Sequence, residues 1–257
     1  MRVFINQRRL NRSRQLAQVL FIVSIAILLG TMALTSGIVP IKNPILYAAP
    51  LVLMPVLLIT IMNSIWLTNY YGRTPYAEDV VRSGLKGLDK RTILYQYMLP
   101  ADHVVVSLRG IYTLTTRFQE TQFKIDGSEW TDHKARGPFG PLFRYLKQER
   151  LGKPFVQATR EAHDVQKIVN EALGTNSGVV VQPTVVFLSD KAALEIIDPQ
   201  LPVVHASPKK NPSLKTLLRE DRKDRLTGLT LEQLETLHRS IQALYTAAGQ
   251  SFVESEI

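Results

Sequence analysis

The 257-residue sequence contains no cysteine. This absence excludes a disulfide framework, a cysteine-ligated zinc site, an iron–sulfur cluster and a thiol nucleophile. The sequence also lacks a P-loop, a glycine-rich dinucleotide-binding turn after a strand, and a Ser-His-Asp signature. Any function must therefore be inferred from the distribution of charge and from less specific motifs.

Charge is also missing from two long stretches near the N-terminus. No charged residue occurs from Gln15 to Ile41, none occurs from Asn43 to Gly72, and Lys42 alone separates the two stretches. Each stretch exceeds the roughly 20 apolar residues that cross about 30 Å of hydrocarbon as a helix. Two prolines inside the second stretch are compatible with this interpretation, because transmembrane helices tolerate proline. We expect residues 15–72 to form a two-helix transmembrane hairpin.

Two alternatives to this hairpin stay open at the level of sequence. The stretches are also apolar enough to be buried helices of a soluble protein. The first stretch also follows a basic leader, as the apolar region of a cleaved signal peptide does. However, it is longer than a usual signal-peptide core, and Thr35-Ser36-Gly37 is a poor cleavage site.

The formal net charge of +9 is explained largely by membrane topology. Residues 1–14, a basic leader, hold five arginines and no acidic residue, and more basic residues follow the second apolar stretch. The positive-inside rule therefore places both termini in the cytoplasm and the Lys42 loop outside, for a multi-pass protein of the cell membrane. About +3 remains for residues 73–257, so net charge alone does not indicate a nucleic-acid partner.

The remainder of the chain shows the pattern of an α/β protein. Apolar residues at helical spacing alternate with β-branched runs that are bounded by glycine and proline. We expect one cytoplasmic domain over 73–212 and a helical C-terminal segment over 213–257. The helices are expected at 76–88, 155–173, 213–226 and 230–247, and the strands at 92–99, 102–107, 111–118, 122–125, 179–188 and 202–205.

The order of these elements, with three short motifs, resembles the NERD (nuclease-related) domain of the PD-(D/E)xK nuclease-like superfamily. The motifs are Ala101-Asp-His-Val-Val-Val-Ser-Leu-Arg-Gly-Ile-Tyr112, Lys153-Pro-Phe-Val-Gln-Ala158 and Val185-Val-Phe-Leu188. The resemblance implies a restriction-endonuclease-like mixed sheet flanked by helices. It also implies a phosphodiester-cleaving site in which two carboxylates hold Mg²⁺.

The catalytic positions that the resemblance implies are only partly kept. Asp102 stands at the first acidic position, whereas Thr115 replaces the second acid and Arg117 replaces the lysine. A hydroxyl does not supply the charge that a hard divalent cation needs, and arginine does not give up a proton. We therefore expect weak metal binding by Asp102 and a catalytically degenerate site, with Mg²⁺ needed only where activity remains.

An acid from elsewhere in the chain would restore such a site. The candidates are Glu120, Asp126 and Glu129, and Glu78 on the first helix stands where the family often has an acid. Gln157 matches the glutamine at the family's helix start. His103 alternates to the opposite face of its strand from Asp102, which favours a structural role. His133 and His163 are too far apart in sequence to indicate zinc.

A basic stretch at residues 134–153, between the expected strands and the expected helix at 155–173, suggests a second binding element. Aromatic residues are interleaved with its basic residues Lys134, Arg136, Arg144 and Lys147. Such a composition suits a phosphate backbone with stacked bases, the anionic inner leaflet, or a solvated loop.

The sequence predicts a membrane-anchored NERD-like protein that binds or scaffolds, with nucleic acid as the expected ligand and the lipid bilayer as a partner. One alternative is an active Mg²⁺-dependent nuclease with a displaced acid. Another is a structural membrane protein that contacts protein partners and no nucleic acid.

Overall fold

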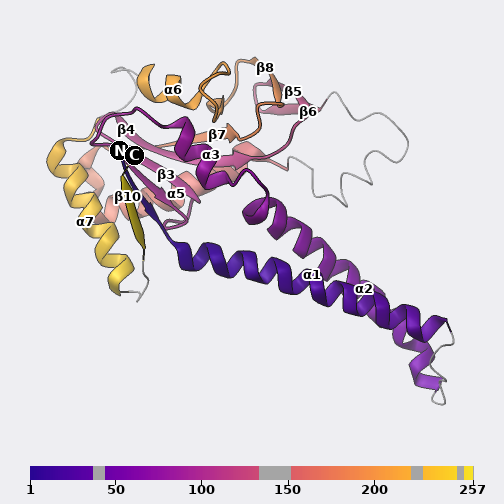
Figure 1. Cartoon of the computed structure of the whole chain (residues 1–257). Coiled ribbons are helices and arrows are strands. Elements are labelled where there is room, and N and C mark those ends of the chain that lie inside the picture. The colour runs from indigo at the N-terminus through magenta and orange to yellow at the C-terminus, as the bar shows by residue number, and fades with distance from the viewer. Residues whose placement is uncertain (37–43, 133–151, 221–227, 248–251, 257) are drawn as a thin grey trace. The chain divides into compact units, whose positions relative to one another are not determined.

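A computed structural model describes residues 1–36, 44–132, 152–220, 228–247 and 252–256 (Figure 1). The chain forms two compact units. The first unit contains Met1–Arg9 and the described residues from Pro75 onward, and the second contains Leu10–Thr74. Each unit is described separately below.

The second unit is built from two long apolar helices. Helix α1 spans Gln7–Thr35, helix α2 spans Pro44–Leu67, and a π-helical turn, η1, follows at Thr68–Gly72. By length and composition both helices are sufficient to cross a membrane, and only 17% of the apolar window of each is buried. Such exposure does not fit the core helices of a soluble protein, whose apolar residues are removed from water.

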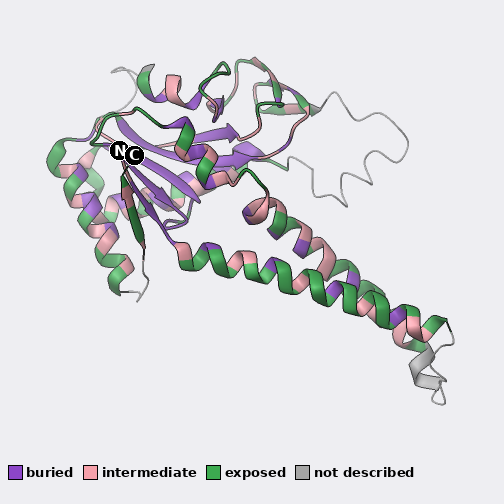
Figure 2. Ribbon diagram, viewed as in Figure 1, coloured by how far each residue is buried: buried purple, intermediate pink, exposed green. Residues whose placement is uncertain are grey.

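Small and polar side chains contribute to the contact between these two helices. The buried positions of α1 recur every seven residues, at Leu10, Ala17, Ser24 and Thr31. Ser64 Oγ donates to the carbonyl oxygen of Ala17 at 3.0 Å, whereas Ile22, Leu29 and Leu51 are exposed. Exposed positions recur along both helices (Figure 2). Small residues inside and apolar residues outside are typical of helices packed in lipid.

A mixed seven-stranded sheet forms the centre of the first unit (Figure 1). Its strand order is β10-β1-β2-β3-β4-β7-β9. Strands β2, β3 and β4 form an antiparallel meander, whereas β1 runs parallel to β2, and β7 runs parallel to β4 and β9. The strands are β1 Arg2–Ile5, β2 Ile93–Gln96, β3 His103–Ser107, β4 Gly110–Arg117, β7 Val181–Phe187, β9 Val203–His205 and β10 Val253–Glu256.

Helices cover both faces of this sheet, which explains why its strands are apolar on both sides. On one face lie α5 (Pro154–Leu173) and α7 (Leu231–Ala247), which pack on side chains such as Tyr95 and Val104. On the other face lie α3 (Ala77–Gly84) and α6 (Leu214–Glu220), packed on side chains such as Leu94 and Val105. Gly84 lets α3 approach the carbonyl of Ala206, where a Cβ would clash.

A second, smaller sheet of order β6-β5-β8 lies beyond β4 in the chain. Its strands are β5 Gln122–Asp126, β6 Glu129–Asp132 and β8 Ala193–Ile197, and a 3₁₀ turn, η2, occupies Thr175–Ser177. Phe123 and Ile125 of β5 pack with Phe155 of α5 and Phe187 of β7. The small sheet therefore shares a core with the long helix α5.

The structure confirms an α/β protein with two long apolar N-terminal helices, but it differs from the expected segments at both ends. Within the expected leader 1–14, Arg2–Ile5 form β1, whose Val3 and Phe4 are fully buried. Asn6 Oδ1 then accepts the backbone N–H of Arg9 at 2.9 Å, so Asn6 caps the start of α1. The expected C-terminal helical segment also supplies strand β10 and packs into the main core through α7.

The pairing of β1 has a direct topological consequence. β1 precedes the two apolar helices in the chain, yet it pairs with β2, which follows them, and with β10. If the helices span a bilayer, both ends of the hairpin must therefore lie on the same side. Cleavage of a signal peptide would also remove an interior strand of the sheet.

We expect Phe4→Ala to destabilise the first unit strongly. The Phe4 ring contacts Tyr95, His238 and Phe252 at centroid distances of 5.7, 4.9 and 5.5 Å. Loss of a buried phenylalanine costs about 3–5 kcal/mol of unfolding free energy. Chemical denaturation of the detergent-solubilised chain measures this change. Val180→Ala, at a side chain 55% exposed, is the control and should change stability by less than about 0.5 kcal/mol. Equal effects would contradict a structural role for β1.

Candidate polar site at the sheet edge

The candidate site lies at one edge of the large sheet, where β3 begins and β4 ends. Because β3 and β4 are antiparallel, Asp102, just before β3, lies near the same edge as Thr115 and Arg117 of β4. Alternation along β4 turns Thr115 and Arg117 toward the face covered by α5. The edge therefore combines the three sequence-predicted catalytic positions with the N-terminal half of α5.

A chain of hydrogen bonds joins the predicted residues to Glu161, which the sequence interpretation missed. Thr115 Oγ1 donates to Glu161 Oε2 at 2.6 Å, and Gln157 Nε2 donates to Glu161 Oε1 at 2.7 Å. The guanidinium of Arg117 donates from Nη2 to Gln157 Oε1 at 2.8 Å and from Nη1 to the carbonyl of Thr116 at 2.8 Å. Both Glu161 oxygens and the Gln157 amide are thus satisfied within the protein.

Glu161 brings a second carboxylate into the neighbourhood of Asp102. Burial raises the pKa of Glu161 above its ordinary value, and the negative charge of Asp102 raises it further. The hydrogen bonds from Thr115 and Gln157 and the charge of Arg117 oppose this rise in pKa. The β4 position where the resemblance implies an acid holds Thr115, and Thr115 binds an acid from α5.

Asp102 is paired with a cation at the start of α1. Its Oδ1 lies 3.7 Å from Arg9 Nη2, and its side chain is only 12% exposed. Arg9 Nη1 also donates to the carbonyls of Tyr97 and Leu99, both at 3.4 Å. Arg9, which belonged to the expected leader, is therefore part of the candidate site.

Glu78 is buried on α3 and contacts the residues before Asp102. Tyr97 Oη donates to Glu78 Oε2 at 3.4 Å, and Gln96 Nε2 donates to the Glu78 carbonyl at 2.9 Å. The backbone N–H of Tyr97 in turn donates to the carbonyl of Asp102 at 2.6 Å. Glu78 and Asp102 thus both contact Tyr97, from different elements.

The other proposed replacement acids lie elsewhere in the fold. Glu120 pairs with Lys191 at 3.6 Å and accepts a hydrogen bond from Ser189. Asp126 and Glu129 lie opposite each other in the backbone register of the β5–β6 hairpin, in the small sheet. Glu161, by contrast, lies close enough to Asp102 for the negative charge of Asp102 to help raise the Glu161 pKa.

The donor set fits Mg²⁺ poorly. Within the described ranges, no group of three or more His, Asp or Glu side chains is placed to hold a metal ion. Asp102 and Glu161 are hard oxygen ligands, but Arg9 pairs with the first, and Thr115 and Gln157 donate to the second. Two carboxylates with these partners need several waters to complete the six oxygen ligands of Mg²⁺.

His103 is fully buried next to Asp102 but belongs to the opposite face of β3. Its ring contacts Tyr97 at a centroid distance of 5.1 Å, and neither ring nitrogen has a hydrogen-bond partner among the described residues. Burial lowers its pKa to about 3. His163 is exposed on α5 beside Asp164 at 3.8 Å.

The predicted basic binding residues lie outside the described residues. These residues are Lys134, Arg136, Arg144 and Lys147. The described residues also leave out His133 and Lys42. Their role stays a prediction.

We expect His103→Leu to reduce the loss of stability in mild acid. The unfolded chain binds a proton at His103 near pH 6.5, whereas the folded chain does so only near pH 3, so folding stability falls as the pH falls below 6.5. Between pH 7.5 and pH 5 this difference is worth about 2 kcal/mol of unfolding free energy. Denaturant unfolding at both pH values measures it. His163→Leu, at an exposed histidine, is the control, and an unchanged pH dependence in His103→Leu would contradict a buried neutral imidazole.

Comparison with known proteins leaves the site to be interpreted from its own residues. No protein-family model, curated protein or solved structure matches the chain. The resemblance to nuclease-related domains therefore stays a prediction from the sequence motifs alone.

Proposed function

We propose that this chain is a membrane-anchored α/β protein whose cytoplasmic domain is a nuclease-fold relic, of restriction-endonuclease-like type, that binds nucleic acid rather than cleaving it. The observation that supports it best is the hydrogen-bonded chain from Thr115 through Glu161 and Gln157 to Arg117. Thr115 and Arg117, at the positions of metal ligand and lysine, are linked through Glu161 and Gln157, which supports a structural rather than a hydrolytic use of this edge.

The membrane anchorage is supported by independent observations. Two helices are long and apolar enough to span, and the pairing of β1 requires both ends of the hairpin on one side. The arginines of residues 1–14 and the basic residues after Arg73 favour the cytoplasm for that side. The proposed location is the cell membrane, with both termini inside.

Nucleic acid is the proposed ligand because of the resemblance and the basic, aromatic-rich stretch at 134–153. Arginine and lysine neutralise phosphates, and aromatic rings stack on bases. The inner leaflet offers the same basic residues an anionic surface, so the test must distinguish a phosphate backbone from lipid.

A second candidate is an Mg²⁺-dependent nuclease with a displaced acid. The specific observation in its favour is the proximity of Glu161 to Asp102, since the charge of Asp102 raises the Glu161 pKa. In that case Glu161 would supply the second carboxylate that β4 lacks.

We expect the full chain in nanodiscs of neutral lipid to bind labelled single-stranded DNA and RNA and not to cleave them. Binding should weaken with salt, with a slope of about −0.7 per phosphate contact. Lys134→Glu with Arg136→Glu should reduce the affinity and the slope, because two phosphate contacts are lost. Fluorescence anisotropy measures both quantities. The matched control is Lys209→Glu with Lys210→Glu, at exposed residues in another part of the chain.

Four outcomes would contradict this proposal. Cleavage with Mg²⁺ or Mn²⁺ that is lost in both Asp102→Asn and Glu161→Gln, but kept in Glu120→Gln, would support the nuclease. If the control double variant weakens nucleic-acid binding as much as Lys134→Glu with Arg136→Glu does, binding depends on overall positive charge and not on the 134–153 stretch. Absence of nucleic-acid binding at low salt would favour a structural protein. Co-sedimentation of the chain with anionic vesicles, lost in Lys134→Glu with Arg136→Glu, would show that the 134–153 stretch binds lipid.

A further inference from the structure

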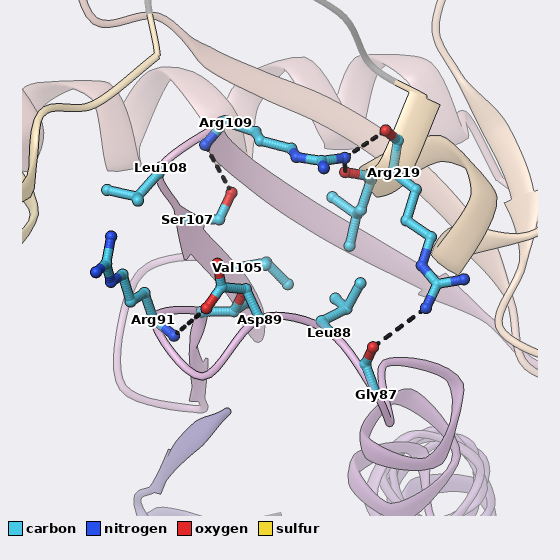
Figure 3. Close-up of a pocket in the computed structure, with 11 residues that line it drawn as sticks. Gly87, Leu88, Asp89, Arg91, Val105, Ser107, Leu108, Arg109 and Arg219 are labelled. Carbon is cyan, nitrogen blue, oxygen red and sulfur yellow. Dashed lines mark hydrogen bonds between the residues drawn. The ribbon is translucent and has the colours of Figure 1, made fainter.

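A cavity of about 270 Å³ lies at the opposite end of β3 and β4 from the candidate site. It is bounded by the turn between α3 and β2, by the β3–β4 turn and by the end of α6 (Figure 3). Its apolar lining comes from Leu88, Val105, Leu108 and Leu218. A cavity of this size takes a small molecule rather than a nucleic-acid strand.

Among the described residues, the cavity lining holds three arginines and one acid, Asp89. Figure 3 shows Arg91 and Arg219 on opposite sides of it, with Arg109 extending toward α6. Across the described residues, the ion pairs within 4.0 Å do not include any of these arginines. Three guanidinium groups around one cavity repel one another unless an anion compensates their charge.

Two of the arginines are held in place by backbone carbonyls. Arg109 Nη1 donates to the carbonyls of Leu218 and Arg219 at the end of α6. Arg219 Nη2 donates to the carbonyl of Gly87 at 3.2 Å. A guanidinium has five N–H donors, so both groups keep donors for a ligand after these bonds are made.

Arg91 differs from the other two arginines because its hydrogen bond to the described residues comes from its backbone N–H and not from its side chain. Its N–H donates to Asp89 Oδ1 at 3.0 Å, which also orients the one acid of the cavity. The Arg91 side chain is exposed at the rim. Its guanidinium is therefore available to a ligand without cost to the fold.

We propose that this cavity binds a small phosphate-bearing molecule with an apolar body. The arginine fork matches the geometry of phosphate oxygens, and three arginines against one aspartate favour a doubly charged phosphate over a single carboxylate. The apolar lining accommodates the rest of the ligand. The inference does not depend on the proposed nucleic-acid function, because it uses none of the residues of the Asp102 edge or of the 134–153 stretch.

The test is calorimetric titration of the full chain in non-ionic detergent with phenyl phosphate, inorganic phosphate and benzyl alcohol. We expect saturable one-to-one binding of phenyl phosphate, about tenfold weaker binding of inorganic phosphate, and no binding of benzyl alcohol. Arg91→Gln should weaken phenyl phosphate binding about tenfold, because it removes one charge-assisted contact. Lys90→Gln is the matched control, since Lys90 is exposed, adjacent in sequence and outside the cavity lining.

The contrary results are equally specific. Absence of saturable phenyl phosphate binding at millimolar concentration would overturn the proposal, as would equal weakening in Arg91→Gln and Lys90→Gln. Displacement of phenyl phosphate by a single-stranded oligonucleotide, with the oligonucleotide affinity itself reduced in Arg91→Gln, would assign the cavity to nucleic acid instead.

Discussion

Backbone hydrogen bonds between β1 and its neighbours join the two ends of the apolar hairpin to one sheet. β1 lies in the interior of the strand order, between β10 and β2, so its residues are buried and both of its edges are paired. This pairing requires both ends of the hairpin on one side of any membrane that it spans. It also sets the start of α1, where Asn6 caps the helix and Arg9 reaches Asp102.

The candidate site depends on the same arrangement. Arg9 belongs to the first turn of α1 and pairs with Asp102, so the polar edge of the domain lies where the chain leaves for the first apolar helix. At this edge Glu161 is half-buried and accepts donors on both oxygens. A carboxylate that is already satisfied contributes less to cation binding than an open one. The edge is therefore a polar network whose groups bind one another.

Strong periodicity made most elements predictable, including α5 and the meander of β2, β3 and β4. The β1 strand was not predictable because it has only four residues, and its partner β2 is about ninety residues away in the chain. Glu161 was missed although a signal existed, since it stands one helical turn after Gln157 and therefore on the same face of α5. The cavity of Arg91, Arg109 and Arg219 joins two separate turns and the end of α6, so no local pattern indicates it.

The most direct test of this account asks whether β1 pairs with β10. An engineered disulfide between the two strands should hold the chain together after the segment between the apolar helices has been cut. Val3 and Ser255 are paired residues, and the cysteine-free chain allows Val3→Cys with Ser255→Cys without background. A protease site placed in the segment 37–43 should be cut from outside intact cells. Because cytoplasmic thiols stay reduced, the washed membranes are then treated with a thiol oxidant, and the account predicts that the two fragments stay joined until reductant is added. The out-of-register pair Val3→Cys with Val253→Cys should not join them. Fragments of the in-register variant that separate without reductant would contradict the account.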